Sequence, residues 1–279
     1  MKSNNQIPLH NIKDEFTINI EPISHKNNYD PSVVHRHNYY EVMFFVKGGG
    51  YQLIDFENVP IVDNSCYLIK PRQVHLVKRE EEADGFLIQF FNTSFFNEDV
   101  SSLLTLQYHS DIKVIFENNK LLTEKSISYL NLISNIIKAG SDFYKQKSIH
   151  LLSTLLYELE ECVIKKDSLS ISNDRSLIRF TELVNQNLNT KTVNEYAEKL
   201  NITSKKLTDV VKSNYGVTPL KFIHNAVLLE IKRDLMFKDT NLKEISFNYN
   251  FDSPSNFSLF VKKNTGLSPS DLQKELLNQ

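Results

Sequence analysis

Two different hydrophobic patterns divide the chain. Between Ile18 and about Phe91, short β-rich runs such as VMFFV, YQLID, CYLIK and GFLIQFF alternate with turn sequences such as KGGG, ENVP and REEEAD. This spacing predicts a compact antiparallel barrel or sandwich. Three consecutive glycines, Gly48, Gly49 and Gly50, lie between two of the runs, where a tight hairpin requires positive φ.

After Asn92 the apolar residues recur with helical spacing, in two stripes. The first stripe comprises Leu121, Leu122, Ile127, Leu130, Ile133, Ile136 and Ile137, and the second comprises Leu151, Leu152, Leu155, Leu156, Leu159 and Val163. They predict two helices that either cover the barrel or pair between subunits. The polar segment 165–174, KKDSLSISND, is typical of a linker, and the rest of the chain predicts short helices.

The C-terminal third contains an internal repeat. Residues 203–219, TSKKLTDVVKSNYGVTP, align with residues 253–269, SPSNFSLFVKKNTGLSP, at an offset of 50 residues. The identical pairs are Val211/Val261, Lys212/Lys262, Asn214/Asn264, Gly216/Gly266 and Pro219/Pro269. Thr203 and Ser253 suit helix N-caps, and the two glycines suit helix ends. Upstream, VNEYAEKLNIT and KEISFNYNFDS share a helix pattern and a tight turn at Asn201 or Asn250, so each copy predicts a short helix followed by a capped one.

Each capped helix has one apolar face and one polar face. The apolar positions are Leu207, Val210 and Val211 in the first copy, and Phe257, Phe260 and Val261 in the second. A short helix followed by a capped helix with a polar outer face is the pattern of a helix-turn-helix unit. A plain helical bundle with solvated lysines is the alternative for either copy alone. The segment LKFIHNAVLLEIKRDLMF predicts one shared helix between the copies.

The stretch NFDSPSNFSLFVKKNTGLSPSDLQK resembles the C-terminal signature of the AraC/XylS family of bacterial transcription regulators, roughly G-F-x-[DS]-x-S-x-F-S-R-x-F-K-K-x-x-G-x-[ST]-P. The resemblance covers about residues 175–276 and implies two helix-turn-helix units joined by a long helix. It places the recognition helices at 204–213 and 254–263. The implied DNA-binding residues are Ser204, Lys205, Lys206, Thr208, Asp209 and Lys212, and Pro254, Ser255, Asn256, Ser258, Leu259 and Lys262.

Two departures from that signature change what is expected. Asn250 replaces the usual glycine, which is tolerable because asparagine adopts left-handed conformations more readily than most residues. Leu259 stands where an arginine is common, and Asp209 occupies the equivalent place in the first unit. Leucine cannot donate a hydrogen bond and could only contact a thymine methyl group. The second unit is therefore expected to recognise DNA mostly by shape and backbone.

The front half resembles a cupin. His35, His37, Glu41 and Gly48 match the first cupin motif, H-x-H-x3-E-x6-G. The segment 70–75, KPRQVH, resembles the second motif, P-x-G-x-x-H, but lysine and arginine replace its proline and glycine, and an arginine replaces the family's closing asparagine. The resemblance implies a cupin-like sensor barrel whose interior holds a small polar effector.

Two histidines at i and i+2 point to one face of a strand, so His35 and His37 can share a site with Glu41 and His75. Such a set is a plausible ligand set for iron, manganese or zinc. The alternative is that the histidines are polar anchors without a metal, and the degraded second motif favours it, so no metal and no cofactor are expected. The expected effector-binding residues are His35, His37, Glu41, Tyr51, Tyr67 and His75. For any single aromatic ring, core packing is the alternative role.

The charge distribution is consistent with an effector-binding N-terminal half and a DNA-binding C-terminal half. Residues 174–279 carry 15 lysines and arginines against 12 aspartates and glutamates, whereas residues 1–173 carry 17 against 22. Only the back half is therefore expected to touch phosphate. The N-terminus has no apolar run for a signal peptide or membrane span, and the two cysteines, Cys66 and Cys162, have no paired spacing, so a cytoplasmic location is expected.

The sequence thus predicts an α+β protein with four segments: a cupin-like sensor barrel at 1–120, a helical dimerisation or cover segment at 121–164, a linker at 165–174 and a double helix-turn-helix domain at 175–279. The expected function is sequence-specific transcription regulation without enzymatic activity. Expected partners are double-stranded DNA, a small-molecule effector, RNA polymerase and a second copy of the chain, but no membrane. A metal-dependent cupin enzyme with a helical tail and an architectural DNA binder without a ligand are the alternatives.

Overall fold

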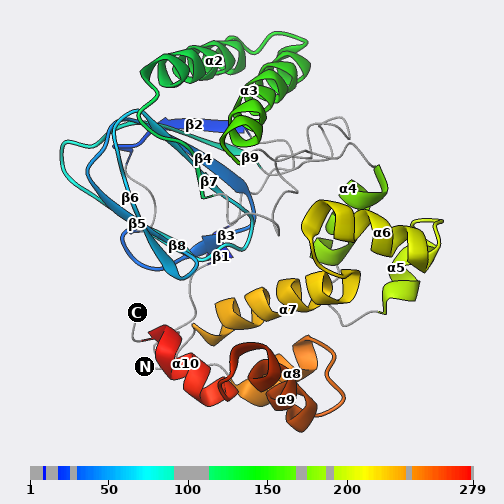
Figure 1. Ribbon diagram of the computed structural model, residues 1–279. Helices are drawn as coiled ribbons and strands as arrows, with labels where there is room; N and C mark the ends of the chain where they lie inside the picture. The colour runs from blue at the N-terminus through cyan, green and yellow to red at the C-terminus, as the bar shows by residue number, and fades with distance from the viewer. Residues whose placement is uncertain are drawn as a thin grey trace. The chain divides into compact units, whose positions relative to one another are not determined.

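Figure 1 shows the computed structural model, which describes residues 9–10, 18–25, 30–90, 113–167, 175–186, 192–236 and 241–277. The chain divides near residue 170 into two compact units. The N-terminal unit combines β-sheets with two long helices, and the described part of the C-terminal unit is helical. The α+β fold class is confirmed. Most of the predicted linker lies outside the described residues. No described helix is long and apolar enough to cross a lipid bilayer.

The N-terminal unit contains two antiparallel sheets that share one interior. The five-stranded sheet has the order β10 (Val114–Phe116), β7 (Ser65–Ile69), β4 (Tyr40–Lys47), β9 (Asp84–Phe90) and β2 (Ile18–Pro22). The three-stranded sheet has the order β6 (Glu57–Pro60), β5 (Gly50–Ile54) and β8 (His75–Arg79). Two short strands, β1 (Leu9–His10) and β3 (Arg36–His37), pair in parallel. In Figure 1 the longer strands curve around a common centre.

Strand alternation sorts the side chains of β4 onto two faces. Phe45 points into the interior between the sheets, where it joins an apolar cluster with Ile54 of β5 and Tyr67 of β7. Val42 and Phe44 point the other way and belong to a second cluster on the outer face of the five-stranded sheet. The period-2 pattern of a strand therefore builds two cores from one element.

Two helices cover the outer face of the five-stranded sheet, α2 (Lys120–Ala139) and α3 (Tyr144–Asp167). Leu130 of α2 and Leu155 of α3 are buried in the outer cluster with the sheet residues. The side chain of Asn119 caps the start of α2, and Gly140 ends it with a φ of 60°. These helices are the two that the apolar stripes predict.

The C-terminal unit is built around one central helix. Its described helices are α4 (Arg175–Gln186), α5 (Val193–Lys199), α6 (Ser204–Tyr215), α7 (Pro219–Leu235), α8 (Leu242–Asn248), α9 (Pro254–Thr265) and α10 (Pro269–Leu277). The ring of Phe222 on α7 contacts Phe180 of α4 and Tyr215 of α6. The ring of His224, also on α7, contacts Phe260 of α9. The α7 helix is therefore the shared helix that the sequence predicts between the repeats.

Candidate functional sites

Each repeat forms a short helix, a tight turn and a capped helix, with α5 and α6 in the first and α8 and α9 in the second. Asn201 and Asn250 lie in the turns with φ of 54° and 55°. The left-handed conformation that the sequence predicts for Asn250 is confirmed. Thr203 and Ser253 each accept a hydrogen bond from a backbone N–H of the first helical turn, at 3.1 and 3.2 Å. Both N-cap predictions are confirmed.

The outer faces of the two capped helices are exposed within their unit. Lys205, Lys206, Asp209 and Lys212 are exposed on α6, while Ser204 and Thr208 are half-buried. The Ser204 hydroxyl donates to the side-chain oxygen of Asn194 at 2.6 Å, and Thr208 donates to the backbone carbonyl of Ser204 at 2.7 Å. These two hydroxyl protons are therefore already engaged within the first helix-turn-helix unit.

On α9 all the predicted DNA-binding residues are exposed, namely Pro254, Ser255, Asn256, Ser258, Leu259 and Lys262. Leu259 is 66% exposed, although its side chain is apolar. The buried face holds Phe257 and Val261, as the sequence predicts, and Phe260 is half-buried against His224. Both helices therefore combine an apolar inner face with an exposed outer face.

In the N-terminal unit, the histidines of the two cupin-like motifs are brought together by the backbone. His35 and His75 exchange two backbone hydrogen bonds, each of 2.9 Å. The His75 ring lies 4.1 Å from the His35 ring and 4.8 Å from the His37 ring, between ring centroids. All three residues are buried. The structure thus gathers the three histidines that the sequence predicts to share a site.

The turn of the second motif contributes to this arrangement. Arg72, which replaces the motif's glycine, has a φ of 66°, in the region that glycine adopts at the lowest cost. Its backbone N–H donates to the carbonyl of His37 at 2.7 Å. Arg72 therefore adopts the left-handed conformation that a glycine favours, and its backbone ties the turn to the strand that carries His37.

Backbone carbonyls fix the orientation of each imidazole. The Nδ1 atoms of His35, His37 and His75 lie 2.8, 2.7 and 3.2 Å from the carbonyl oxygens of Val33, Tyr39 and Gln73. Because a carbonyl oxygen can only accept, Nδ1 carries the proton, and in the neutral ring Nε2 then carries the lone pair. The ring of Tyr39 also stacks on that of His37 at 3.9 Å between centroids.

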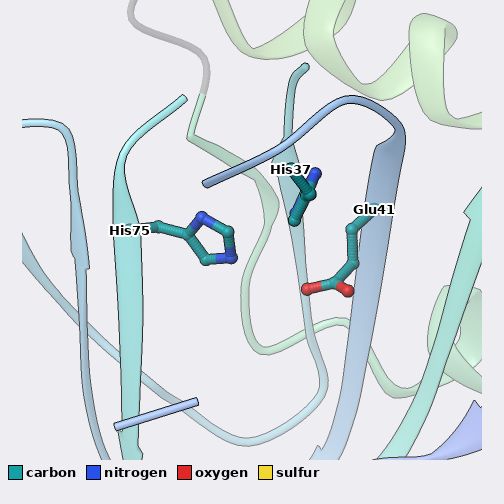
Figure 2. A group of neighbouring side chains, drawn as sticks. All are labelled: His37, Glu41 and His75. Atoms are coloured by element: carbon teal, nitrogen blue, oxygen red, sulfur yellow. The ribbon is translucent and has the colours of Figure 1, made fainter. Parts of the chain in front are cut away.

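Glu41 of β4 lies beside these rings and is buried. Figure 2 shows the side chains of His37, Glu41 and His75 pointing toward one another. Desolvation by burial raises the pKa of the Glu41 carboxyl to about 7. The hydrogen bond from Gln89 acts in the opposite direction and lowers this pKa, but its effect is smaller. The Gln89 amide donates to the Glu41 carboxylate at 2.6 Å. The carboxyl is therefore neutral in a larger fraction of molecules near neutral pH than an exposed glutamate is.

The two tyrosines predicted to bind the effector have surroundings that differ from those of the histidine cluster. Tyr67 is fully buried in the apolar interior, and its hydroxyl donates to the Pro60 carbonyl at 2.8 Å and accepts from the Val62 N–H at 3.1 Å. Tyr51 is 38% exposed, and its ring lies 5.7 Å from the Lys78 ammonium. Tyr51 and Gln52 alternate along β5, so the interior position belongs to Gln52 and not to Tyr51.

Gln52 and Gln89 are buried polar residues that the motifs do not identify, and Gln52 is the more unusual of the two. Its side chain is fully buried, and both its amide nitrogen and its amide oxygen lack a hydrogen-bond partner among the described residues. It shares the inner face with Ile54, which pairs with His75 in the register between β5 and β8. Residues two apart on a strand lie on the same face, so an inward Ile54 predicts that Gln52 also points inward.

The cluster also has the chemistry of a metal site. One ligand atom from each of His37, Glu41 and His75 lies within 4.8 Å of the others, and all three residues are buried. Imidazoles whose Nδ1–H groups are held by backbone carbonyls are typical of metal ligands. Bonds of about 2.1 Å from a zinc ion would draw such ligand atoms to about 3.4 Å of one another. The residues therefore fit a divalent ion after a small contraction.

Comparison with known proteins finds similarity to helix-turn-helix proteins. Residues 196–275 match a family model described as a helix-turn-helix domain. An uncharacterized HTH-type transcriptional regulator of Bacillus subtilis, YfiF, is 22% identical over 253 residues, which cover 87% of this chain and 79% of that protein. ToxT from Vibrio cholerae O395 is 16% identical with a TM-score of 0.43, covering 95% of this chain and 99% of that one. An AraC-type regulator from Chromobacterium violaceum is 17% identical with a TM-score of 0.33, covering 36% and 91%.

The paired helix-turn-helix units and the matched family model define a DNA-binding protein. More specifically, the chain is a DNA-binding transcription regulator with a helix-turn-helix domain at residues 196–275, and it is similar to the HTH-type regulator YfiF.

Proposed function

We propose that this regulator binds DNA through α6 and α9 and that a small polar molecule held by the interior residues of the N-terminal unit modulates that binding. The observation that carries the first part is the duplication of a capped helix with an exposed outer face. Helix-turn-helix proteins place such helices in the major groove, and two units recognise a longer site than one. We infer that this regulator acts in the cytoplasm.

Lys212 and Lys262 occupy equivalent positions on the two recognition helices, and both are exposed. We expect Lys212→Ala and Lys262→Ala each to weaken DNA binding and to reduce by about one the slope of log affinity against log salt concentration, because a phosphate contact is lost. Binding is measured by fluorescence anisotropy over a salt series. Lys138→Ala, on the exposed end of α2, is the matched control. Unchanged slopes in both variants would contradict the assignment of α6 and α9.

The interior polar residues support the second part of the proposal. His37, Glu41 and His75 converge in the interior of the N-terminal unit, and Gln52 contributes an amide whose donor and acceptor have no partner among the described residues. A buried amide without a hydrogen bond costs about 1–3 kcal/mol, and a ligand that bonds to it recovers that cost. Such a set suits a small polar effector with both hydrogen-bond donors and acceptors. An effector acts only if it binds one arrangement of the regulator better than another.

We expect Gln52→Leu to raise the free energy of unfolding of the chain without ligand by about 1 kcal/mol, because an apolar side chain replaces an unsatisfied amide. The same substitution should reduce the stabilisation by the effector. A panel of polar metabolites is screened by thermal shift on the full chain, and each hit is repeated on the variant. A hit that stabilises both proteins equally would show that the ligand binds elsewhere. No hit across the panel would favour an architectural role.

A metal ion is the second candidate occupant, and the convergence of His37, Glu41 and His75 favours it. A bound divalent ion would act there as a Lewis acid that attracts an anionic or hydroxyl group of the effector. Elemental analysis of the purified full chain decides this point. One equivalent of ion that His75→Ala and His37→Ala both remove supports a metal-dependent sensor. An ion content below a tenth of an equivalent supports direct recognition by the side chains.

The remaining partners follow from the regulator class. We infer that two copies pair through the exposed side of α2 and α3, where Leu132 and Tyr157 are 48% and 41% exposed. A dimer would lengthen the DNA site and raise specificity. RNA polymerase is the partner through which a bound regulator changes transcription. Analytical ultracentrifugation of the chain and its Leu132→Asp variant tests the dimer, and a variant that still dimerises with the same affinity would exclude this surface.

A further inference from the structure

The two recognition helices differ in the side chains that they can present to bases. Counted from the first helical residue, the second, third and sixth positions are Lys205, Lys206 and Asp209 in α6, and Ser255, Asn256 and Leu259 in α9. All six residues are exposed. The ninth position is lysine in both helices, Lys212 and Lys262. The units therefore share a position suited to phosphate but differ at the positions suited to base edges.

On α9 the outer face offers an apolar group and an amide side by side. Leu259 is 66% exposed, and Asn256 lies three residues earlier, so the two share one face of the helix. In the major groove the thymine methyl group is the apolar feature, and the adenine N7 and N6 groups match an asparagine amide. The Ser258 hydroxyl donates to the Pro254 carbonyl at 2.9 Å, so its proton is engaged within the helix.

On α6 the outer face carries charges of both signs. Asp209 can only accept hydrogen bonds, and phosphates repel it. Cytosine N4 suits it better than adenine N6, because adenine presents its N7 acceptor beside the N6 donor. Lys205 is exposed on the same helix, and a lysine ammonium matches the guanine O6 and N7 acceptors. The first unit therefore has the chemistry for a G·C pair, whereas the second has the chemistry for an A·T pair.

We propose that the operator is bipartite and chemically unequal: α9 recognises an A·T pair through Asn256 and Leu259, and α6 recognises a G·C pair through Lys205 and Asp209. This inference rests on the proposed function, in which both helices enter the major groove. It also revises the expectation that the second unit recognises DNA mostly by shape and backbone. The two elements should lie about one helical turn apart, roughly 34 Å, when both helices bind one side of the duplex.

The experiment begins with selection of duplexes from a randomised library by the full chain. Each thymine of the selected site is then replaced singly by deoxyuridine, which keeps base pairing but lacks the methyl group. We expect one replacement to weaken binding about fourfold, the effect of leaving one buried methyl group uncontacted. Leu259→Ala should bind the original site more weakly and should lose sensitivity to that replacement. Leu259→Met, which keeps an apolar side chain, should retain it.

Asp209→Ala is the matched control, because it changes the sixth position of the other recognition helix. It should relax the choice of base in the G·C element and leave the deoxyuridine effect unchanged. Should the chain select a defined sequence in which no deoxyuridine effect depends on Leu259, the inference is wrong and the proposed function stands. Should the chain select no sequence at all, both are wrong. Thermal melting of each variant confirms that the fold is kept.

Discussion

Glu230→Ala is expected to lower the free energy of unfolding of the C-terminal unit by about 3–5 kcal/mol. Glu230 and Arg233 form an ion pair within α7, and their side chains are only 4% and 1% exposed. Removing the carboxylate leaves the Arg233 guanidinium buried without this counter-charge, and the remaining charge is costly to keep away from water. Because α7 contacts both helix-turn-helix units, DNA binding should be lost as the unit unfolds.

Denaturant unfolding followed by far-ultraviolet circular dichroism measures the change, and peptide-level hydrogen exchange locates it in α7. The double variant Glu230→Met with Arg233→Leu removes both charges and should stay close to the wild-type stability, because apolar side chains of similar volume replace a buried pair at little cost. Glu124→Ala breaks the exposed pair with Lys120 and should change stability by less than about 1 kcal/mol. A loss of similar size in the double variant would show that packing matters more than charge.

The repeat explains why the C-terminal unit could be predicted closely from the sequence. Capping and helix termination are local rules, so Thr203, Ser253, Gly216 and Gly266 identify the ends of the recognition helices without tertiary information. The shared helix follows from the run between the two copies. What the sequence does not reveal is the buried pair inside α7, because Glu230 and Arg233 look like two ordinary exposed charges until the packing of neighbouring helices encloses them.

The site in the N-terminal unit could be predicted only in part. The fold brings His35, His37, Glu41 and His75 together, as the motif spacing predicts. The choice of the flanking residues depends on which face of each strand points inward, and a shift of one residue exchanges the two faces. Tyr51, which the sequence predicts to bind the effector, is partly exposed, because the registers of β5 with β6 and β8 turn its neighbour Gln52 inward. The two backbone hydrogen bonds of the Tyr67 hydroxyl, donated to the Pro60 carbonyl and accepted from the Val62 N–H, are likewise set by the fold.

At the glycines of the β4–β5 turn, the sequence predicts the backbone conformation but not how closely the neighbouring strand approaches. The sequence predicts positive φ in this three-glycine turn, and Gly49 and Gly50 have φ of 130° and 90°, whereas Gly48 has no positive φ. A Cβ atom at Gly50 would lie 2.0 Å from the Lys78 carbonyl oxygen on the neighbouring strand β8. The glycine is therefore required both for its conformation and for the close approach of the two strands.

Gly50→Ala is accordingly expected to lower the free energy of unfolding of the N-terminal unit by about 2–5 kcal/mol, since a strained φ and a backbone clash act together. Gly140→Ala is the matched control: Gly140 has a φ of 60°, but a Cβ there would meet nothing within 4 Å, so the cost should be about 1 kcal/mol. Denaturant unfolding of the two variants gives the difference. Equal losses would mean that β8 yields to the added methyl group. A larger loss for Gly50→Ala, with weaker stabilisation by the effector, would show that the spacing of β5 and β8 also positions Gln52 and His75.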